Sequence, residues 1–114
     1  MQVGHGPPQV RENLFGGHGQ VLVWNLLQGT AAPPFTAVLS CVLDDGGRVG
    51  PHVQHEYDEI VVGLTGCGEV KVAGQARPFG PGAVVYLPLG DNLEIINETG
   101  NGPLRYLIIK AARG

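Results

Sequence analysis

The chain has 114 residues with a hydrophobic fraction of 43%, which is enough for a single domain with one core. Its formal net charge of −3 and the lack of a Lys/Arg cluster argue against nucleic acid or an anionic membrane surface as a partner. No apolar run approaches the roughly 18 residues of a membrane span. The first twenty residues do not resemble a secretory signal, so we expect a cytoplasmic protein.

The elements predicted along the chain are short strands separated by Gly- and Pro-rich turns. Residues 1–19 are interpreted as an N-terminal arm and residues 20–114 as the folded domain. The predicted strands are 20–28, 35–43, 59–64, 68–74, 83–88, 92–98 and 103–111. No segment keeps a 3.6-residue apolar period over three turns, so no long helix is expected. The pattern is typical of an all-β sandwich, jelly roll or small barrel.

Two local features complete this prediction. The strands at 59–64 and 68–74 are expected to form a hairpin joined through Thr65–Gly68. Cys41 lies within a predicted strand and is expected in the core, whereas Cys67 lies between two glycines and is expected in an exposed turn.

A first spaced motif runs from Gly46 to Gly66. Five residues separate Gly46 from His52, one residue separates His52 from Gln54, four separate Gln54 from Glu59, and six separate Glu59 from Gly66.

A second motif runs from Gly82 through Pro88, Gly90 and Leu93 to Asn97. Both spacings resemble the two motifs of the cupins, with a linker of the short type found in small single-domain microbial members. The resemblance implies a single-domain cupin jelly-roll β-barrel over residues 20–114, often dimeric, with a pocket between the motif strands.

The resemblance also implies a candidate metal site. Two histidines and a glutamate of the first motif, with a histidine of the second, usually hold one divalent ion in cupins. Carried onto this chain, the first histidine is His52 and the glutamate is Glu59. The second histidine falls on Gln54, with His55 one position later, and the histidine of the second motif falls on Leu93.

Strand geometry leaves two ligand sets open, because alternate side chains of a strand share one face. One set is His52, Gln54 and Glu59 with a bulge between them, and the other replaces Gln54 by His55, with His52 reaching from the preceding loop. Such ligands suit iron, manganese, nickel, zinc or copper. A metal-free polar mouth of the barrel is the alternative interpretation.

Further residues are candidates for the wall of the pocket. Leu93, Ile95 and Asn97 share the face that looks into the barrel in the family, but core packing and, for Asn97, the bonding of a turn are the preferred interpretations. Tyr57 and Tyr86 could each offer a hydroxyl group to a ligand or be half-buried barrel residues.

Two classes of function stay open. One is a metal-dependent enzyme of the dioxygenase or isomerase class, acting on a small organic substrate. The other is a non-catalytic barrel that binds or senses a small molecule without metal, in which Leu93 marks the loss of the ion. A homodimer is expected from the family, with the arm or an open strand edge as the contact. The fold does not name a substrate.

Overall fold

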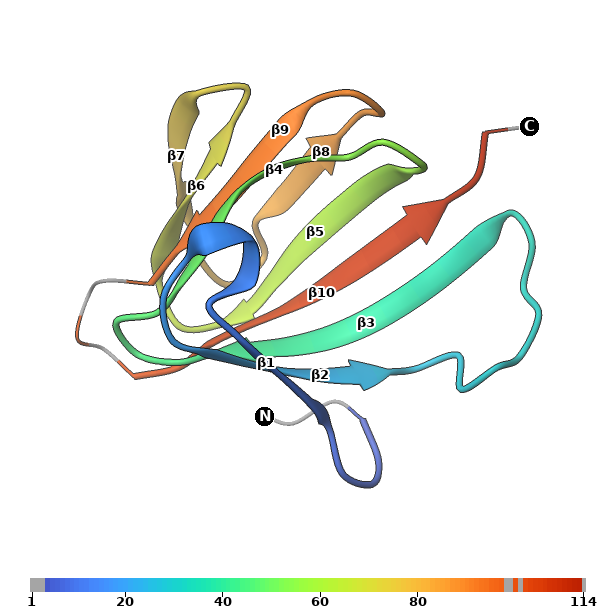
Figure 1. The fold of residues 1–114 in the computed structure, drawn as a ribbon, viewed down its shortest axis with the longest axis horizontal. Helices are drawn as coiled ribbons and strands as arrows, with labels where there is room; N and C mark the ends of the chain where they lie inside the picture. The colour runs from blue at the N-terminus through green and yellow to red at the C-terminus, as the bar shows by residue number, and fades with distance from the viewer. Residues whose placement is uncertain (1–3, 98–99, 101, 114) are drawn as a thin grey trace.

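The computed structural model describes residues 4–97, 100 and 102–113, which form two antiparallel sheets packed face to face (Figure 1). The six-stranded sheet has the order β1 (Gln9–Glu12), β2 (Gln20–Asn25), β3 (Phe35–Leu43), β10 (Leu104–Ala111), β5 (Asp58–Thr65) and β8 (Val84–Leu87). The four-stranded sheet has the order β4 (Arg48–Val53), β9 (Asn92–Ile96), β6 (Gly68–Val72) and β7 (Gln75–Phe79). The all-β prediction is confirmed, and the arrangement fits a jelly roll whose two sheets do not close into a continuous barrel.

The core lies between the sheets because each strand turns alternate apolar residues inward. On β10, Leu104 and Tyr106 are buried. The ring of Tyr106 packs in an edge-to-face arrangement on Phe79, which lies in the opposite sheet, with 6.2 Å between ring centroids. Leu43 and Val61 on neighbouring strands are fully buried beside them. This alternation fixes which β10 side chains reach the interior.

The predicted hairpin between residues 59–64 and 68–74 is wrong. The first segment pairs with β10 and β8, whereas the second pairs with β9 and β7 in the other sheet. The chain crosses between the sheets at Gly66, whose φ of 87° and close approach to the carbonyl oxygen of Pro103 exclude a side chain. The hairpin of β6 is instead made with β7 through Ala73 and Gly74, which both have positive φ, as in the turns that favour two-residue hairpins.

Three strands of the described chain were not predicted. β4 and β7 each contain a proline, and β1 lies within the predicted arm, where it pairs with β2 over four residues. β7 and β1 are both edge strands, where a proline or a short run is tolerated because one side has no partner strand. The boundary between an arm at residues 1–19 and the domain stays a prediction.

Two smaller observations concern exposure and membranes. Cys41 is buried and Cys67 is exposed, as expected from their positions in a strand and a turn. Within the described residues, no helix has the length and apolar character to cross a membrane.

Candidate functional site

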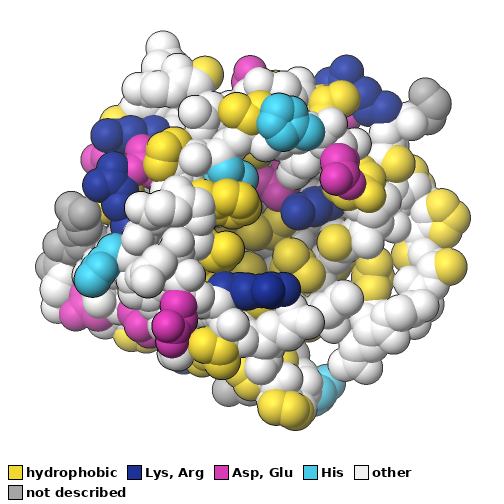
Figure 2. Space-filling model, in the orientation of Figure 1, with side chains coloured by type: hydrophobic (Ala, Val, Ile, Leu, Met, Phe, Trp, Pro, Cys, Tyr) yellow, Lys and Arg dark blue, Asp and Glu magenta, His cyan; other side chains and the backbone are white. Residues whose placement is uncertain are grey.

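A cavity of about 450 Å³ lies between the two sheets, and the space-filling view shows it as a hollow with apolar walls (Figure 2). Its volume is in the range of small-molecule sites. The apolar wall comes from β2, β3, β4, β9 and β10, and its members include Val21, Val23, Leu39, Val49, Leu93, Ile95 and Ile108. Polar side chains also line the cavity, namely Gln9, Arg11, Asn25, His52, Gln54, Glu59, Tyr106 and Lys110.

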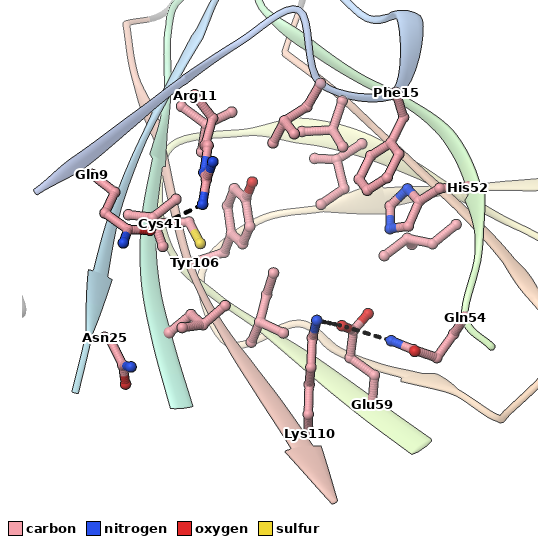
Figure 3. A pocket seen from close by; sticks show the side chains of 18 of the residues that line it. Gln9, Arg11, Phe15, Asn25, Cys41, His52, Gln54, Glu59, Tyr106 and Lys110 are labelled. Carbon is pink, nitrogen blue, oxygen red and sulfur yellow. Dashed lines mark hydrogen bonds and ion pairs between the residues drawn. The ribbon is translucent and has the colours of Figure 1, made fainter. Parts of the chain in front are cut away.

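Glu59 and Lys110 form the most unusual pair in this lining (Figure 3). They are direct cross-strand partners on β5 and β10, and Nζ of Lys110 lies 3.9 Å from Oε1 of Glu59. The side chain of Glu59 is only 3% exposed, and burial raises the pKa of its carboxyl group, against the opposing effects of the Lys110 charge and the Gln54 amide. Its second oxygen, Oε2, has no hydrogen-bond partner among the described residues.

Gln54 is held so that its amide nitrogen points toward Glu59. Its Oε1 accepts hydrogen bonds from the backbone N–H groups of Glu56 and Tyr57, at 3.2 and 3.3 Å. The amide nitrogen of Gln54, Nε2, lies 3.5 Å from Oε1 of Glu59. Gln54 therefore presents a donor to the cavity, because its oxygen is already used by the turn between β4 and β5.

His52 lies on β4 directly opposite Leu93 of β9. Its Nδ1 is 3.1 Å from the carbonyl oxygen of Gly50, which only accepts, so Nδ1 carries the proton of the neutral ring and Nε2 keeps its lone pair. Burial lowers the pKa of His52, with the Lys110 charge acting in the same direction and the Gly50 bond opposing them. The imidazole is therefore neutral at physiological pH.

Phe15 covers His52 at one side of the cavity. Its ring stacks on the imidazole, with 4.0 Å between centroids and 12° between planes. Phe15 belongs to a short 3₁₀ turn, η1 (Leu14–Gly16), which packs closely on β4. A side chain at Gly50 would place its Cβ 2.0 Å from the Phe15 carbonyl oxygen, so glycine is what allows this approach.

The predicted site residues divide into two groups. His52, Gln54 and Glu59 line one cavity, and so do Leu93 and Ile95. In one regular strand, His52 and Glu59 would point to opposite faces, because their positions differ by an odd number of residues. A register shift between Val49 and His52 and the irregular residues 54–57 together allow both side chains to face the cavity.

The other predicted residues lie away from the lining. His55 is exposed and Tyr57 is half-buried, and neither contributes to the cavity wall. Tyr86 is 55% exposed on β8. Asn97 is buried, and its Nδ2 donates to the carbonyl oxygens of Leu43, Asp44 and Gly102, which ties the turn after β3 to the end of β9.

Arg11 and Lys110 were missed by sequence reasoning. Lys110 continues the inward alternation of β10 after Tyr106 and Ile108, so its inward position could have been read from the period of two. Arg11 lies on the unpredicted strand β1, and its side chain extends into the cavity, where Nη2 donates to Oε1 of Gln9 at 3.2 Å (Figure 3).

The Cupin domain family matches residues 39–110, well over half of the chain. The chain belongs to the cupins. Both motifs lie within this match, and the predicted family is thereby confirmed. A search of curated proteins found no match.

Several solved structures are similar to this cupin. A protein from Thermotoga maritima described as a predicted oxalate decarboxylase is 27% identical, with a TM-score of 0.85 over 94% of this chain and 93% of the other. A Cupin 2 conserved barrel domain protein from Salinispora arenicola is 29% identical, with a TM-score of 0.71 over 96% and 87% of the two chains. A sugar phosphate isomerase from Silicibacter pomeroyi is 21% identical, with a TM-score of 0.70 over 82% and 60%, and shows the fold alone.

Cupins commonly bind a divalent metal ion, but the lining of this cupin does not fit one. Among residues 4–97, 100 and 102–113, no three His, Cys, Asp or Glu side chains come together. Leu93 lies opposite His52 where a second imidazole would be needed, and Gln54 offers N–H rather than oxygen. The ammonium group of Lys110 already lies beside Glu59. A divalent ion would face one imidazole, one carboxylate and a cation.

Cys41 is also part of the lining but is not suited to nucleophilic chemistry. Burial, reinforced by the charge of Glu59, raises the pKa of its thiol to about 12. The reactive form of cysteine is the thiolate, which is negligible at neutral pH for such a group. The cavity therefore offers acid–base and anion-binding groups rather than a thiol nucleophile.

Proposed function

We propose that this cupin binds a small organic anion in its cavity without a divalent ion. The observation that carries the proposal is the charge of the lining. Arg11 and Lys110 are cationic, and Glu59 is the one acidic side chain beside them in the described lining, so the cavity is positive whether Glu59 is ionised or not. The whole chain, in contrast, has a formal net charge of −3. A positive hollow in an acidic protein favours anionic ligands.

The remaining wall supports an organic rather than an inorganic anion. The apolar side chains of Leu39, Leu93 and Ile108 contribute to the lining and can bury a hydrocarbon portion. Polar groups on a mostly apolar wall are typical of small-molecule sites, where the few polar contacts fix the orientation of the ligand. A carboxylate attached to a small apolar body satisfies both parts of the cavity.

The likeness to the Thermotoga maritima protein supports the same class of ligand. That protein is described as a predicted oxalate decarboxylase, and oxalate is a small dicarboxylate. The ligand class is carried over here, whereas metal-dependent chemistry is not, because Leu93 lies opposite His52 and the ammonium group of Lys110 lies beside Glu59. A metal-dependent enzyme is therefore the less favoured alternative.

The proposal is tested by ligand-observed NMR with matched anionic and neutral compounds in buffer that contains EDTA. The panel is acetate, oxalate, pyruvate, phenylpyruvate and benzoate, with benzamide as the neutral partner of benzoate. Loss of a charge-assisted hydrogen bond costs about 1.5–3 kcal/mol, so we expect Lys110→Met to weaken anion binding roughly tenfold or more. Lys71→Met, on β6 and outside the lining, is the matched control. Equal binding of benzoate and benzamide, or no binding of any anion, would contradict the proposal.

We also propose that the protein forms a homodimer through the β8 edge of the six-stranded sheet. Val84 and Tyr86 on β8 are 63% and 55% exposed, and Ile60, the cross-strand partner of Tyr86, is 39% exposed. β8 is the last strand of its sheet, so a second copy can pair with it about a two-fold axis and cover these side chains. Sedimentation of wild type and of Val84→Lys tests this, and a monomeric wild-type protein at micromolar concentration would contradict it.

A further inference from the structure

The unpartnered oxygen of Glu59 points to a chemical role beyond binding. Oε1 of this carboxyl group is near the Gln54 amide and the Lys110 ammonium group, at 3.5 and 3.9 Å. Oε2 is buried and has no hydrogen-bond partner among the described residues. Buried polar atoms nearly always have a partner, so an orphan oxygen in the wall of a cavity is expected to meet a group of the ligand.

The neighbouring groups limit which residue can move a proton. Nε2 of His52 keeps a lone pair, but Phe15 covers one face of that ring, whereas the ammonium group of Lys110 lies beside Glu59. The thiol of Cys41 stays protonated. Glu59 lines the cavity and has a buried oxygen without a hydrogen-bond partner among the described residues, and Lys110 places a positive charge next to it. A carboxylate beside a cation in a mostly apolar cavity is the arrangement needed to remove a proton and to stabilise the negative charge that forms.

We propose that Glu59 is the general base, and Lys110 the oxyanion-stabilising group, of a metal-independent enolisation of small α-keto acids in this cavity. The inference rests on the proposed anion-binding function and adds a reaction to it. An α-keto acid has a carboxylate and a carbonyl group, and the cavity has two cationic side chains, Arg11 and Lys110, to receive them.

The reaction needs no oxidant, reductant or cofactor. Oε2 of Glu59 takes a proton from the carbon next to the keto group, and the electron pair of the broken C–H bond forms a C=C bond. The π electrons of the carbonyl group move to its oxygen, which becomes an enolate beside Lys110. Return of a proton from Glu59 to carbon restores the keto acid. In D₂O the Glu59 carboxyl group first exchanges its proton for a deuteron of the solvent, and return of that deuteron labels the carbon.

Burial supports the role of Glu59 as a base. It raises the pKa of the carboxyl group, which brings the strength of the conjugate base closer to what proton abstraction near neutral pH requires. The charge of Lys110 acts on this pKa in the opposite direction.

The experiment measures hydrogen–deuterium exchange at C3 of pyruvate and phenylpyruvate by ¹H NMR, with untagged protein in D₂O containing EDTA. We expect the wild-type protein to accelerate exchange over buffer and Glu59→Gln to lose at least a hundredfold of the protein-dependent rate. Lys110→Met, whose side chain is partly exposed and more tolerant of change, is expected to lose at least tenfold. Glu69→Gln, on β6 and outside the lining, is the matched control and keeps the full rate.

Binding of the same keto acids is recorded in the same samples, which separates two kinds of failure. If they bind without faster exchange, or if Glu59→Gln exchanges as fast as wild type, the catalytic inference is overturned and the binding function stands. If neither the keto acids nor the other anions of the panel bind, the proposed function falls as well. If Glu59→Gln does not fold, Lys110→Met still tests the inference. Exchange by Lys110→Met at the wild-type rate would overturn the proposed catalytic role of the Glu59–Lys110 pair.

Discussion

Lys110 and Glu59 face each other across the ladder between β10 and β5, with 3.9 Å between Nζ and Oε1. The pair lies in a cavity whose other walls are largely apolar, and it places a cation beside the carboxylate that a metal ion would need. The same lysine also gives the cavity part of its positive charge. One residue thus explains both why the site does not fit a divalent ion and why it suits an organic anion.

We expect the wild-type protein, purified untagged and without chelator, to contain far less than one equivalent of any divalent metal. The double variant Leu93→His/Lys110→Met should gain affinity for Zn²⁺, because residue 93 is the cross-strand partner of His52 and because the competing cation is removed. Elemental analysis and calorimetric titration measure both. A full equivalent of metal in the wild-type protein would refute the expectation.

The stability of Glu59→Gln should depend less on pH than that of the wild type. Burial raises the pKa of Glu59 in the folded state, so the folded protein prefers the protonated form. The contribution of Glu59 to the free energy of unfolding is therefore largest below the unfolded-state pKa and is lost as pH rises through the folded-state pKa. Urea denaturation between pH 4 and 8 measures the effect, with Glu69→Gln as control. Parallel pH profiles for wild type and Glu59→Gln would show that Glu59 is not perturbed.

His52 should act in the opposite direction. Its pKa is lowered by burial, so its contribution to stability is present above the unfolded-state pKa and is lost as pH falls through the folded-state pKa. His52→Phe keeps an aromatic ring next to Phe15 but leaves the Gly50 carbonyl oxygen without its donor, at a cost of about 1 kcal/mol at pH 8. We expect this cost to shrink at pH 5. A cost that grows on acidification would contradict the assignment.

Asn97→Ala should be strongly destabilising although Asn97 does not line the cavity. Its Nδ2 donates to the carbonyl oxygens of Leu43, Asp44 and Gly102, and its side chain is 1% exposed. Leaving these buried and part-buried acceptors without a donor is expected to cost about 2–3 kcal/mol, measured by urea denaturation. Asn92→Ala, at an exposed position of β9, should stay within about 0.5 kcal/mol of wild type. Similar losses for the two variants would remove the special role of Asn97.

The strands with a clear alternation of apolar residues were predictable, and residues 35–43 form a strand with the predicted bounds. Local sequence could not decide which strands pair. The segment 59–64 was joined to its neighbour in sequence, whereas its partners are β8 and β10, both further along the chain. β4 and β7 were not predicted because each contains a proline. A proline is compatible with a strand only where the sheet leaves its nitrogen without a partner.

The candidate site was predictable in part for a related reason. The motif spacing identified His52, Gln54 and Glu59 as candidates, and all three line the cavity. It could not show that His55 is exposed. That outcome depends on the register shift in β4 and the turn that follows it, which shift the phase of the side chains. Lys110 and Arg11 lie outside both motifs, and only the pairing of distant strands brings them to the cavity that Glu59 and His52 also line.

The most direct test of the central claim is a calorimetric titration of the untagged protein with the tightest anion of the panel, before and after dialysis against EDTA, with Lys110→Met alongside. The account predicts that EDTA leaves the affinity unchanged and that Lys110→Met weakens it at least tenfold. Binding that disappears with EDTA, returns with a divalent metal ion and persists in Lys110→Met would contradict it.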